Sequence, residues 1–244
     1  MPPLGISPLI TYFIVPGPYF CAGLPPASIA IAQTSCMVSP SGIDVDSLVA
    51  TTKRTAGITG TIDPVSNLQD DRVYVFSGTN DTVVHTGVVQ KLAHFYGEFV
   101  TTPNRVKEEY SVHAEHSMPT LDYGNECGYL GEPYINNCGF DGVGNMMQHL
   151  YDNTLIEPVA GAPAYTGTFN EFRQADYIDL PWTPLTASMY KSGFVYIPTA
   201  CEPSAEVHTG APCRLHVAYH GCKQSIPDVG SQYYMQVSLL RCAL

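Results

Sequence analysis

The clearest hydrophobic pattern in the chain lies between residues 72 and 112. The run 72–76, in which Arg72 is followed by four apolar or aromatic residues, reads as a strand, and the polar turn 77–81 follows it. A helix is predicted near 84–99, where apolar residues recur at spacings of three and four: Val88, Val89, Leu92, Phe95, Tyr96 and Phe99. A second strand with more charged residues is predicted near 105–112. The pattern therefore predicts a strand, helix and strand joined by polar loops.

Two loops of this unit carry residues that can do chemistry. Asp81 ends the turn after the first strand, and His116 lies in the loop 114–120 after the second. Such folds place reacting groups on loops at the carboxyl ends of parallel strands, and the order matches the closing half of an α/β-hydrolase sheet. The chain is therefore expected to have an α/β fold, with Asp81 and His116 forming two-thirds of a Ser-His-Asp triad.

The rest of the chain has weaker patterns. Residues 1–70 are rich in Pro, Gly, Ser and Thr and read as loops and short elements. A helix is a candidate over about 139–151, and 152–190 reads as an irregular connector. Residues 193–198 and 213–219 alternate as strands do. A chain of 244 residues suffices for one large core, so a single domain is expected.

The charge of the chain excludes two classes of partner. The formal net charge is −11, with 11 Lys and Arg residues in no basic cluster. Nucleic acids and anionic membranes both attract concentrated positive charge, so neither is an expected partner. No stretch approaches the length of a membrane span. The apolar run 9–15 is short, follows no positive charge and ends in Pro16-Gly-Pro18, so it does not match a signal peptide.

Eight cysteines suggest an oxidising, extracellular setting, because disulfides persist there. They form four sequence-adjacent candidate pairs: Cys21 with Cys36, Cys127 with Cys138, Cys201 with Cys213, and Cys222 with Cys242. The first three pairs are the stronger ones, and the pairing of the fourth is left open. No C-x-x-C is present, so no metal is expected. The alternative is a cytosolic protein with scattered core thiols.

Each candidate site residue also has a simpler interpretation. Asp81 could cap the following helix, for which Asp is a preferred residue. His116 could be an ordinary loop histidine, or could form an H-x-x-H metal pair with His113. His220 and Gly221, after the last predicted strand, could form an ordinary turn. We favour the functional interpretation because the residues occur together, in a consistent order.

That order is unusual for a hydrolase. In an ordinary α/β-hydrolase the oxyanion strand comes first, then the nucleophile, the acid and the histidine. Here the acid and the histidine come first, and the oxyanion-like His220-Gly-Cys222 comes last. The order implies a circularly permuted α/β-hydrolase whose nucleophile lies upstream of Asp81.

The chain resembles the secreted fungal-type poly(3-hydroxybutyrate) (PHB) depolymerases, which are single-domain serine esterases with a circularly permuted α/β-hydrolase fold. The resemblance runs from about residue 14 to about 235 and preserves the order of the motifs. The matching segments are Gly17–Ala22, Thr34–Met37, Val73–Val83, His116–Thr120, Pro133–Gly142, Gly193–Pro198 and Cys213–Gln224.

The resemblance implies a role for three residues. Asp81 is the triad acid, His116 is the triad base, and the backbone N–H of Cys222 is one donor of the oxyanion hole. These roles suit the chemistry, because a hydroxyl attacks an ester only when a base takes its proton. Gly221 would let the backbone approach the oxyanion closely. No cofactor is implied, and the complete protein is expected to be a monomer.

The chain departs from the family at the nucleophile. It contains no Gly-x-Ser-x-Gly, and only Ser7 in Gly5-Ile-Ser-Pro-Leu9 imitates one. Pro8 has no N–H to donate to an oxyanion, so Ser7 is not assigned as nucleophile. The family also continues well beyond the His-Gly-Cys motif, whereas this chain stops at Leu244. We therefore expect a fold truncated at both ends.

Three hypotheses on function follow. The first is a polyester depolymerase that acts on PHB, with this chain an incomplete copy that lacks the nucleophile. The second is a noncatalytic protein that binds polyester or another apolar surface through tyrosine-rich loops. The third is an esterase of the same fold that acts on small esters. Activity on a soluble ester but not on polymer film would select the third.

Overall fold

The computed structural model describes residues 31, 33–59, 62–155, 167–186, 189–202, 215–217 and 229–230. The chain divides into two compact units, which are described separately below. The first comprises residues 1–153 with 216–221, and the second comprises 154–215 with 222–244. The expectation of a single domain stays a prediction.

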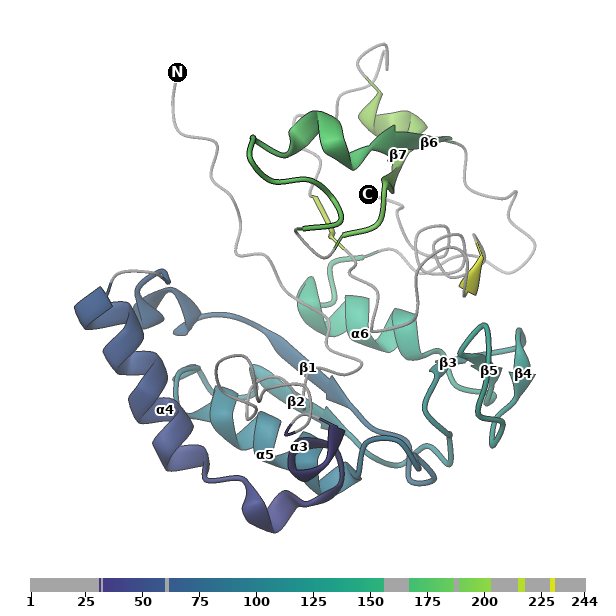
Figure 1. Cartoon of the computed structure of the whole chain (residues 1–244). Coiled ribbons are helices and arrows are strands. Elements are labelled where there is room, and N and C mark those ends of the chain that lie inside the picture. The colour runs from purple at the N-terminus through teal and green to yellow at the C-terminus, as the bar shows by residue number, and fades with distance from the viewer. Residues whose placement is uncertain are drawn as a thin grey trace. The chain divides into compact units, whose positions relative to one another are not determined.

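The first unit contains the predicted strand–helix–strand pattern (Figure 1). Strand β1 is Val73–Phe76, helix α5 is Thr86–Gly97 and strand β2 is Val106–Glu109. The two strands pair in parallel from Val73↔Val106 to Phe76↔Glu109. Strand β2 ends at Glu109, three residues earlier than expected, and beyond it the Ser111 N–H donates a hydrogen bond to the Glu109 carboxylate at 2.9 Å.

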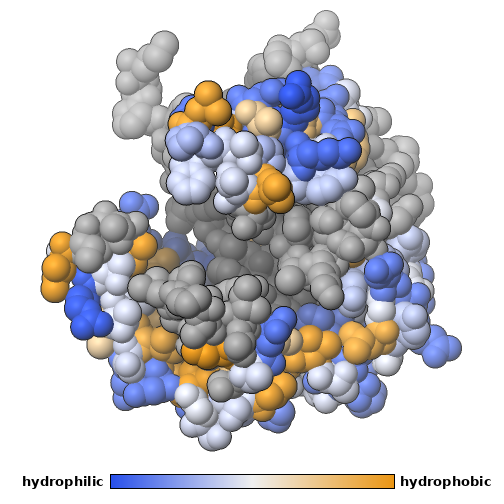
Figure 2. All heavy atoms as spheres, in the orientation of Figure 1, coloured by the Kyte–Doolittle hydropathy of each residue, from blue (hydrophilic) through white to orange (hydrophobic). Residues whose placement is uncertain are grey.

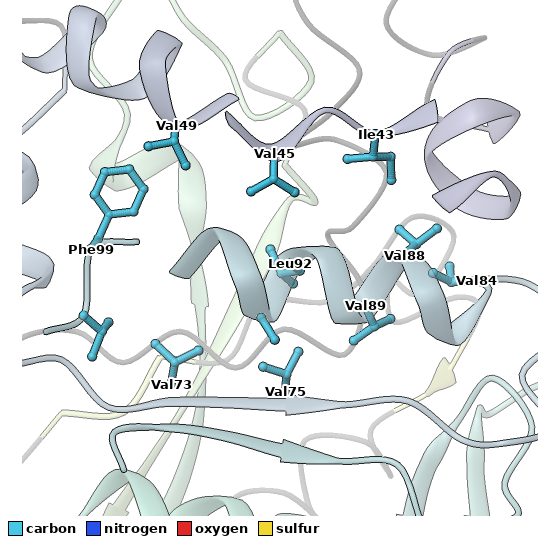
Figure 3. Close-up of a cluster of buried hydrophobic side chains, with 12 residues drawn as sticks. Ile43, Val45, Val49, Val73, Val75, Val84, Val88, Val89, Leu92 and Phe99 are labelled. Atoms are coloured by element: carbon cyan, nitrogen blue, oxygen red, sulfur yellow. The ribbon is translucent and has the colours of Figure 1, made fainter. Parts of the chain in front are cut away.

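The apolar core of this unit lies on one side of β1 (Figure 3). Val73 and Val75 point from β1 towards α5, and Val45 and Val49 approach α5 from the opposite side (Figure 3). All four residues of β1 are buried, which explains why this strand reads as a continuous apolar run. The cluster consists of Ile43, Val45, Val49, Val73, Val75, Val84, Val88, Val89, Leu92, Ala93, Phe99 and Val100.

The helices before β1 were only partly predicted. Helix α3 is Ser35–Val38, and α4 is Val45–Arg54, a ten-residue helix in a region where only loops and short elements were expected. The buried residues of α4 are Val45 and Val49, one turn apart, and with the half-buried Leu48 they form a helical apolar pattern that the sequence analysis did not identify. Its N-cap Asp44 accepts a hydrogen bond from the Ser47 N–H at 3.1 Å. Shorter helical turns follow at Thr55–Thr59 and Val65–Leu68, and another precedes α4 at Pro40–Gly42.

A small parallel sheet and a helix follow β2. Strands β3 (Met118–Thr120) and β4 (Asn125–Glu126) both pair with β5 (Ile135–Asn137), which lies between them. Helix α6, Gly142–Leu150, confirms the helix expected over about 139–151. Its N-cap Asp141 accepts a hydrogen bond from the Gly144 N–H at 2.7 Å.

The second unit contains a strand pair. Strand β6, Gly167–Arg173, pairs antiparallel with β7, Ser192–Pro198. Strand β7 confirms the strand expected at 193–198, whereas the expectation of an irregular connector over 152–190 was wrong at β6. Six of the seven β6 residues are exposed, so the strand is held by its pairing with β7 and shows no burial alternation of its own. Short 3-10 turns lie at Gln174–Tyr177 and Thr199–Cys201.

Hydrophilic and hydrophobic side chains are mixed on the visible surface of the described residues (Figure 2). Among these residues, no helix combines the length and the apolar character that crossing a membrane requires. Leu215–Val217, the described part of the strand expected at 213–219, belong to no strand, and the other residues of that segment lie outside the described residues.

Candidate active site

Asp81 is fixed at the end of the loop that follows β1. One oxygen of its carboxylate, Oδ1, accepts hydrogen bonds from the N–H groups of Val83 and Val84 at 2.9 and 2.8 Å. Helix α5 begins at Thr86, and its N-cap is His85. Asp81 therefore organises a turn ahead of the helix and does not cap it, so the capping interpretation was wrong. Its second oxygen, Oδ2, is left to face the next loop.

The imidazole of His116 bonds to that second oxygen. Nδ1 of His116 lies 2.9 Å from Oδ2 of Asp81, and the two side chains are only 12% and 8% exposed. A carboxylate accepts hydrogen bonds, so Nδ1 carries the proton and the neutral ring keeps a lone pair on Nε2. The structure thus brings the predicted acid and base together, in a geometry that suits the tautomer a general base requires.

The backbone joins the acid loop (residues 77–82) to the histidine loop (residues 111–117). The N–H of Ser77 donates to the Glu109 carbonyl, that of Thr79 to Val112, and that of Asn80 to Ala114, at 3.2, 2.8 and 3.2 Å. These bonds extend the β1–β2 pairing beyond the ends of both strands. The sheet therefore positions the acid loop and the histidine loop as one unit.

His113 has a separate environment in the histidine loop. It is exposed, and its Nδ1 lies 3.0 Å from the Thr79 hydroxyl. Among the described residues, no group of three or more His, Cys, Asp and Glu side chains could hold a metal ion. Of these two histidines in the described part of the loop, His116 contacts Asp81 and His113 contacts Thr79, so the geometry supports His116 as the candidate base.

A further carboxylate, which the sequence analysis missed, lies between the loops. Glu115 is buried, and one of its oxygens bonds to Thr82 in the acid loop and to the backbone of His116. The sequence shows no sign of this role, because neither the burial of Glu115 nor its contact with Thr82 can be read from local spacing.

The disulfide Cys127–Cys138 confirms one predicted pair and flanks the histidine loop. The carbonyl of Cys127 accepts hydrogen bonds from the Glu115 N–H at 3.0 Å and from the Asn136 side-chain amide at 3.1 Å. Cys36 and Cys201 are also disulfide-bonded. Their predicted partners, Cys21 and Cys213, lie outside the described residues.

The other predicted parts of the site also lie outside the described residues. These are His220, Gly221 and Cys222; Ser7, which was not assigned as nucleophile, and Cys242, whose pairing with Cys222 was left open, also lie outside them. Within the described part of the chain, no serine hydroxyl bonds to the His116 ring. The nucleophile and the oxyanion hole therefore stay predictions.

Comparison with curated proteins gives two matches. The chain is 43% identical over 227 residues to a poly(3-hydroxybutyrate) depolymerase of Delftia acidovorans, covering 93% of this chain and 42% of that protein. It is 30% identical over 222 residues to a polyhydroxybutyrate depolymerase of Talaromyces funiculosus, covering 89% of this chain and 58% of that protein. The chain thus spans about half the length of these relatives. No family model matches it.

Solved structures give the same result for the fold. The crystal structure of the PHB depolymerase from Penicillium funiculosum matches with a TM-score of 0.73 and 28% identity, over 92% of this chain and 64% of that one. A PHB depolymerase variant complexed with an R3HB trimer matches with the same values. The expected α/β-hydrolase fold is therefore confirmed. By sequence and by fold, the chain is similar to poly(3-hydroxybutyrate) depolymerases.

Proposed function

We propose that this chain supplies the acid and the base of a serine esterase that hydrolyses poly(3-hydroxybutyrate) to hydroxy-acid oligomers and monomers. The observation that carries the proposal is the 2.9 Å contact between Asp81 Oδ2 and His116 Nδ1, both largely shielded from water. The names of the two relatives and the relative solved with an R3HB trimer support a polyester as substrate.

The proposed reaction uses the two described groups in sequence. Nε2 of His116 takes the proton of a serine hydroxyl as the oxygen attacks the ester carbonyl, and Asp81 stabilises the imidazolium. The ester C–O bond then breaks, and His116 returns the proton to the leaving alcohol. A water molecule attacks the acyl-enzyme by the same route and releases the acid. The overall reaction consumes one water for each ester bond.

Two parts of this site are proposals from the family pattern alone. The serine belongs to a Gly-x-Ser-x-Gly elbow, and Ser7 does not replace it, because Pro8 has no N–H for the oxyanion. The backbone N–H of Cys222 is the proposed oxyanion donor, with Gly221 allowing close approach of the backbone. A single donor of this kind is typically worth about 3 kcal/mol in the transition state.

We also propose that the protein works outside the cell, as a monomer. The disulfide Cys127–Cys138 and the disulfide-bonded Cys36 and Cys201 support an oxidising compartment. A solid polyester cannot enter a cell, which fits the same location. The net charge of −11 disfavours an anionic membrane or a nucleic acid as partner.

The test compares the natural protein that contains this chain with four single variants. Hydrolysis of a soluble short-chain ester and release of hydroxy acid from a PHB film are measured. Asp81→Asn is expected to lower kcat by about 10⁴-fold, because it removes the charge that supports the imidazolium. His116→Ala should cost at least as much. His113→Ala, a matched control three residues away in the same loop, should leave the rate unchanged.

The outcomes separate the candidate functions. Ester hydrolysis that survives His116→Ala would overturn the proposal. Activity on the soluble ester without release from film would select a small-ester esterase, and binding to film without any hydrolysis would select a noncatalytic binder. Ser7→Ala is expected to change nothing, and loss of activity in that variant would identify Ser7 as the nucleophile.

A further inference from the structure

Glu115 is a buried carboxylate beside the proposed base, and the reaction described above does not use it. The residue is only 3% exposed. Burying a carboxylate without hydrogen-bond donors is unfavourable in free energy, so a buried Glu needs compensation. Its partners therefore show what the residue does.

A single oxygen of Glu115, Oε1, accepts three hydrogen bonds. The donors are the Thr82 N–H at 2.7 Å, the Thr82 hydroxyl at 3.1 Å and the His116 N–H at 2.9 Å. Hydrogen bonds to charged groups are about twice as strong as neutral ones. The carboxylate thus ties the acid loop to the residue that carries the base.

The two loops are cross-linked in both directions. Asp81 and Thr82 are neighbours in the acid loop, and Glu115 and His116 are neighbours in the histidine loop. The His116 ring bonds to the Asp81 carboxylate, while the Glu115 carboxylate bonds to Thr82. Two peptide links and two cross-links therefore close a ring. The Asp81–His116 distance cannot open far while the Glu115–Thr82 contact holds.

The histidine loop is supported on its other side as well. The Glu115 N–H donates to the Cys127 carbonyl at 3.0 Å, next to the Cys127–Cys138 disulfide. Glu115 is thus held through its backbone by one neighbour and through its side chain by another. This arrangement keeps the carboxylate in place to hold Thr82.

We propose that Glu115 is a positioning residue, whose carboxylate holds the acid loop and the histidine loop together and so keeps the His116 ring bonded to Asp81. The role rests on the proposed function, because it matters for catalysis only if Asp81 and His116 are acid and base. Glu115 contacts the His116 backbone and not its ring, so it acts through His116.

The test measures the hydrogen bond that Glu115 is proposed to protect. The full chain is labelled with ¹⁵N-histidine, and the exchange of the His116 Nδ1 proton with water is followed by NMR, with the resonance assigned by its loss in His116→Gln. The variants are Glu115→Ala and Glu115→Gln. The matched control is Glu109→Ala, which removes a carboxylate that binds the N–H and hydroxyl of Ser111 in the same segment.

Glu115→Ala is expected to speed exchange of the ring proton at least about tenfold, because losing charged hydrogen bonds raises the population of the open loop. Glu115→Gln keeps an acceptor oxygen at the same position and should restore much slower exchange. Glu109→Ala should match the wild type. A wild-type rate in Glu115→Ala, or a Glu115→Gln rate as fast as that of Glu115→Ala, would overturn the proposal.

Two further measurements keep the proposal testable. If Glu115→Ala does not fold, Thr82→Val removes only the hydroxyl contact and should still speed exchange by a few-fold, about the effect of one hydrogen bond. An unchanged rate there would also overturn the role.

In protein that hydrolyses ester, Glu115→Ala should lower kcat and leave KM unchanged, because substrate contacts are intact. The NMR result does not require hydrolysis, so it tests the role of Glu115 even if the proposed function fails.

Discussion

Gly78 lies against the carbonyl of Ala114, where the acid loop meets the histidine loop. A Cβ on Gly78 would stand 2.0 Å from the Ala114 oxygen and 2.7 Å from its carbonyl carbon. That oxygen also accepts the Asn80 N–H at 3.2 Å, so it cannot move away freely. Only a residue without a side chain allows the two loops to approach this closely.

Gly78→Ala is therefore expected to lower the free energy of unfolding by roughly 2–4 kcal/mol, because the methyl group forces the loops apart. Urea denaturation measures the loss. Gly97→Ala is the matched control: nothing lies within 4 Å of a Cβ at this last position of α5. It should be neutral or stabilise the protein by up to about 1 kcal/mol. Equal effects at the two positions would contradict the packing argument.

The sequence correctly predicted elements whose buried residues form a regular pattern along the element itself. Helix α5 buries Val88, Val89, Leu92 and Ala93, at helical spacing, and β1 is buried throughout, so both are visible from the pattern. Helix α4 buries Val45 and Val49 at helical spacing after its N-cap Asp44, so its signal was present and was overlooked, whereas β6 buries none of its residues and shows no alternation. Strand β6 depends on its pairing with β7, which is a long-range property of the chain.

The candidate site divides in the same way. Asp81 and His116 were predicted because loop residues after successive parallel strands meet at one edge of a sheet. Their 2.9 Å contact shows that the two loops meet, and their roles as acid and base stay predictions. Glu115 was missed because its importance depends on Thr82, which is 33 residues away in the sequence. Contacts of that kind are not visible in local spacing.

The core around α5 should be sensitive to truncation. Leu92 is 4% exposed in the cluster against β1, whereas Leu185 is 87% exposed. Leu92→Ala is expected to cost about 2–5 kcal/mol in unfolding free energy, from lost burial and the cavity left behind. Leu185→Ala, the same change at an exposed site, should stay within about 0.5 kcal/mol. A small loss of unfolding free energy in Leu92→Ala, measured by urea denaturation, would show that neighbouring side chains fill the cavity.

Removing the disulfide beside the histidine loop should weaken the fold. Cys127 and Cys138 are 11 positions apart, and a bridge that closes a loop of this size stabilises a protein by roughly 2–3 kcal/mol. The double variant Cys127→Ala/Cys138→Ala is expected to lose about that much in urea denaturation. The wild type under reducing conditions that open only this bond should match it. An unchanged midpoint in the double variant would show that the Glu115 and Asn136 contacts hold Cys127 without the bridge.

Stability should fall in mild acid because of His149 in α6. The residue is 8% exposed, and its Nε2–H donates to the Arg105 carbonyl at 3.0 Å. Burial lowers the pKa of His149 below its ordinary value of 6.5, and the charges of Arg72 and Lys107 lower this pKa further, against a raising effect of the carbonyl bonds. The folded protein therefore resists protonation of this ring.

The sign follows from that direction. Well above pH 6.5, His149 is neutral in the folded and the unfolded state, so it does not lower the free energy of unfolding. As the pH falls below 6.5, the unfolded chain binds a proton that the folded ring resists, so the free energy of unfolding decreases until the pH is below the folded pKa. Urea denaturation between pH 7 and 5 should show this decrease. His149→Gln keeps a donor for the Arg105 carbonyl and should flatten the decrease, whereas His94→Gln, at an exposed histidine of α5, should not. Parallel pH profiles for all three proteins would show that other groups cause the acid sensitivity.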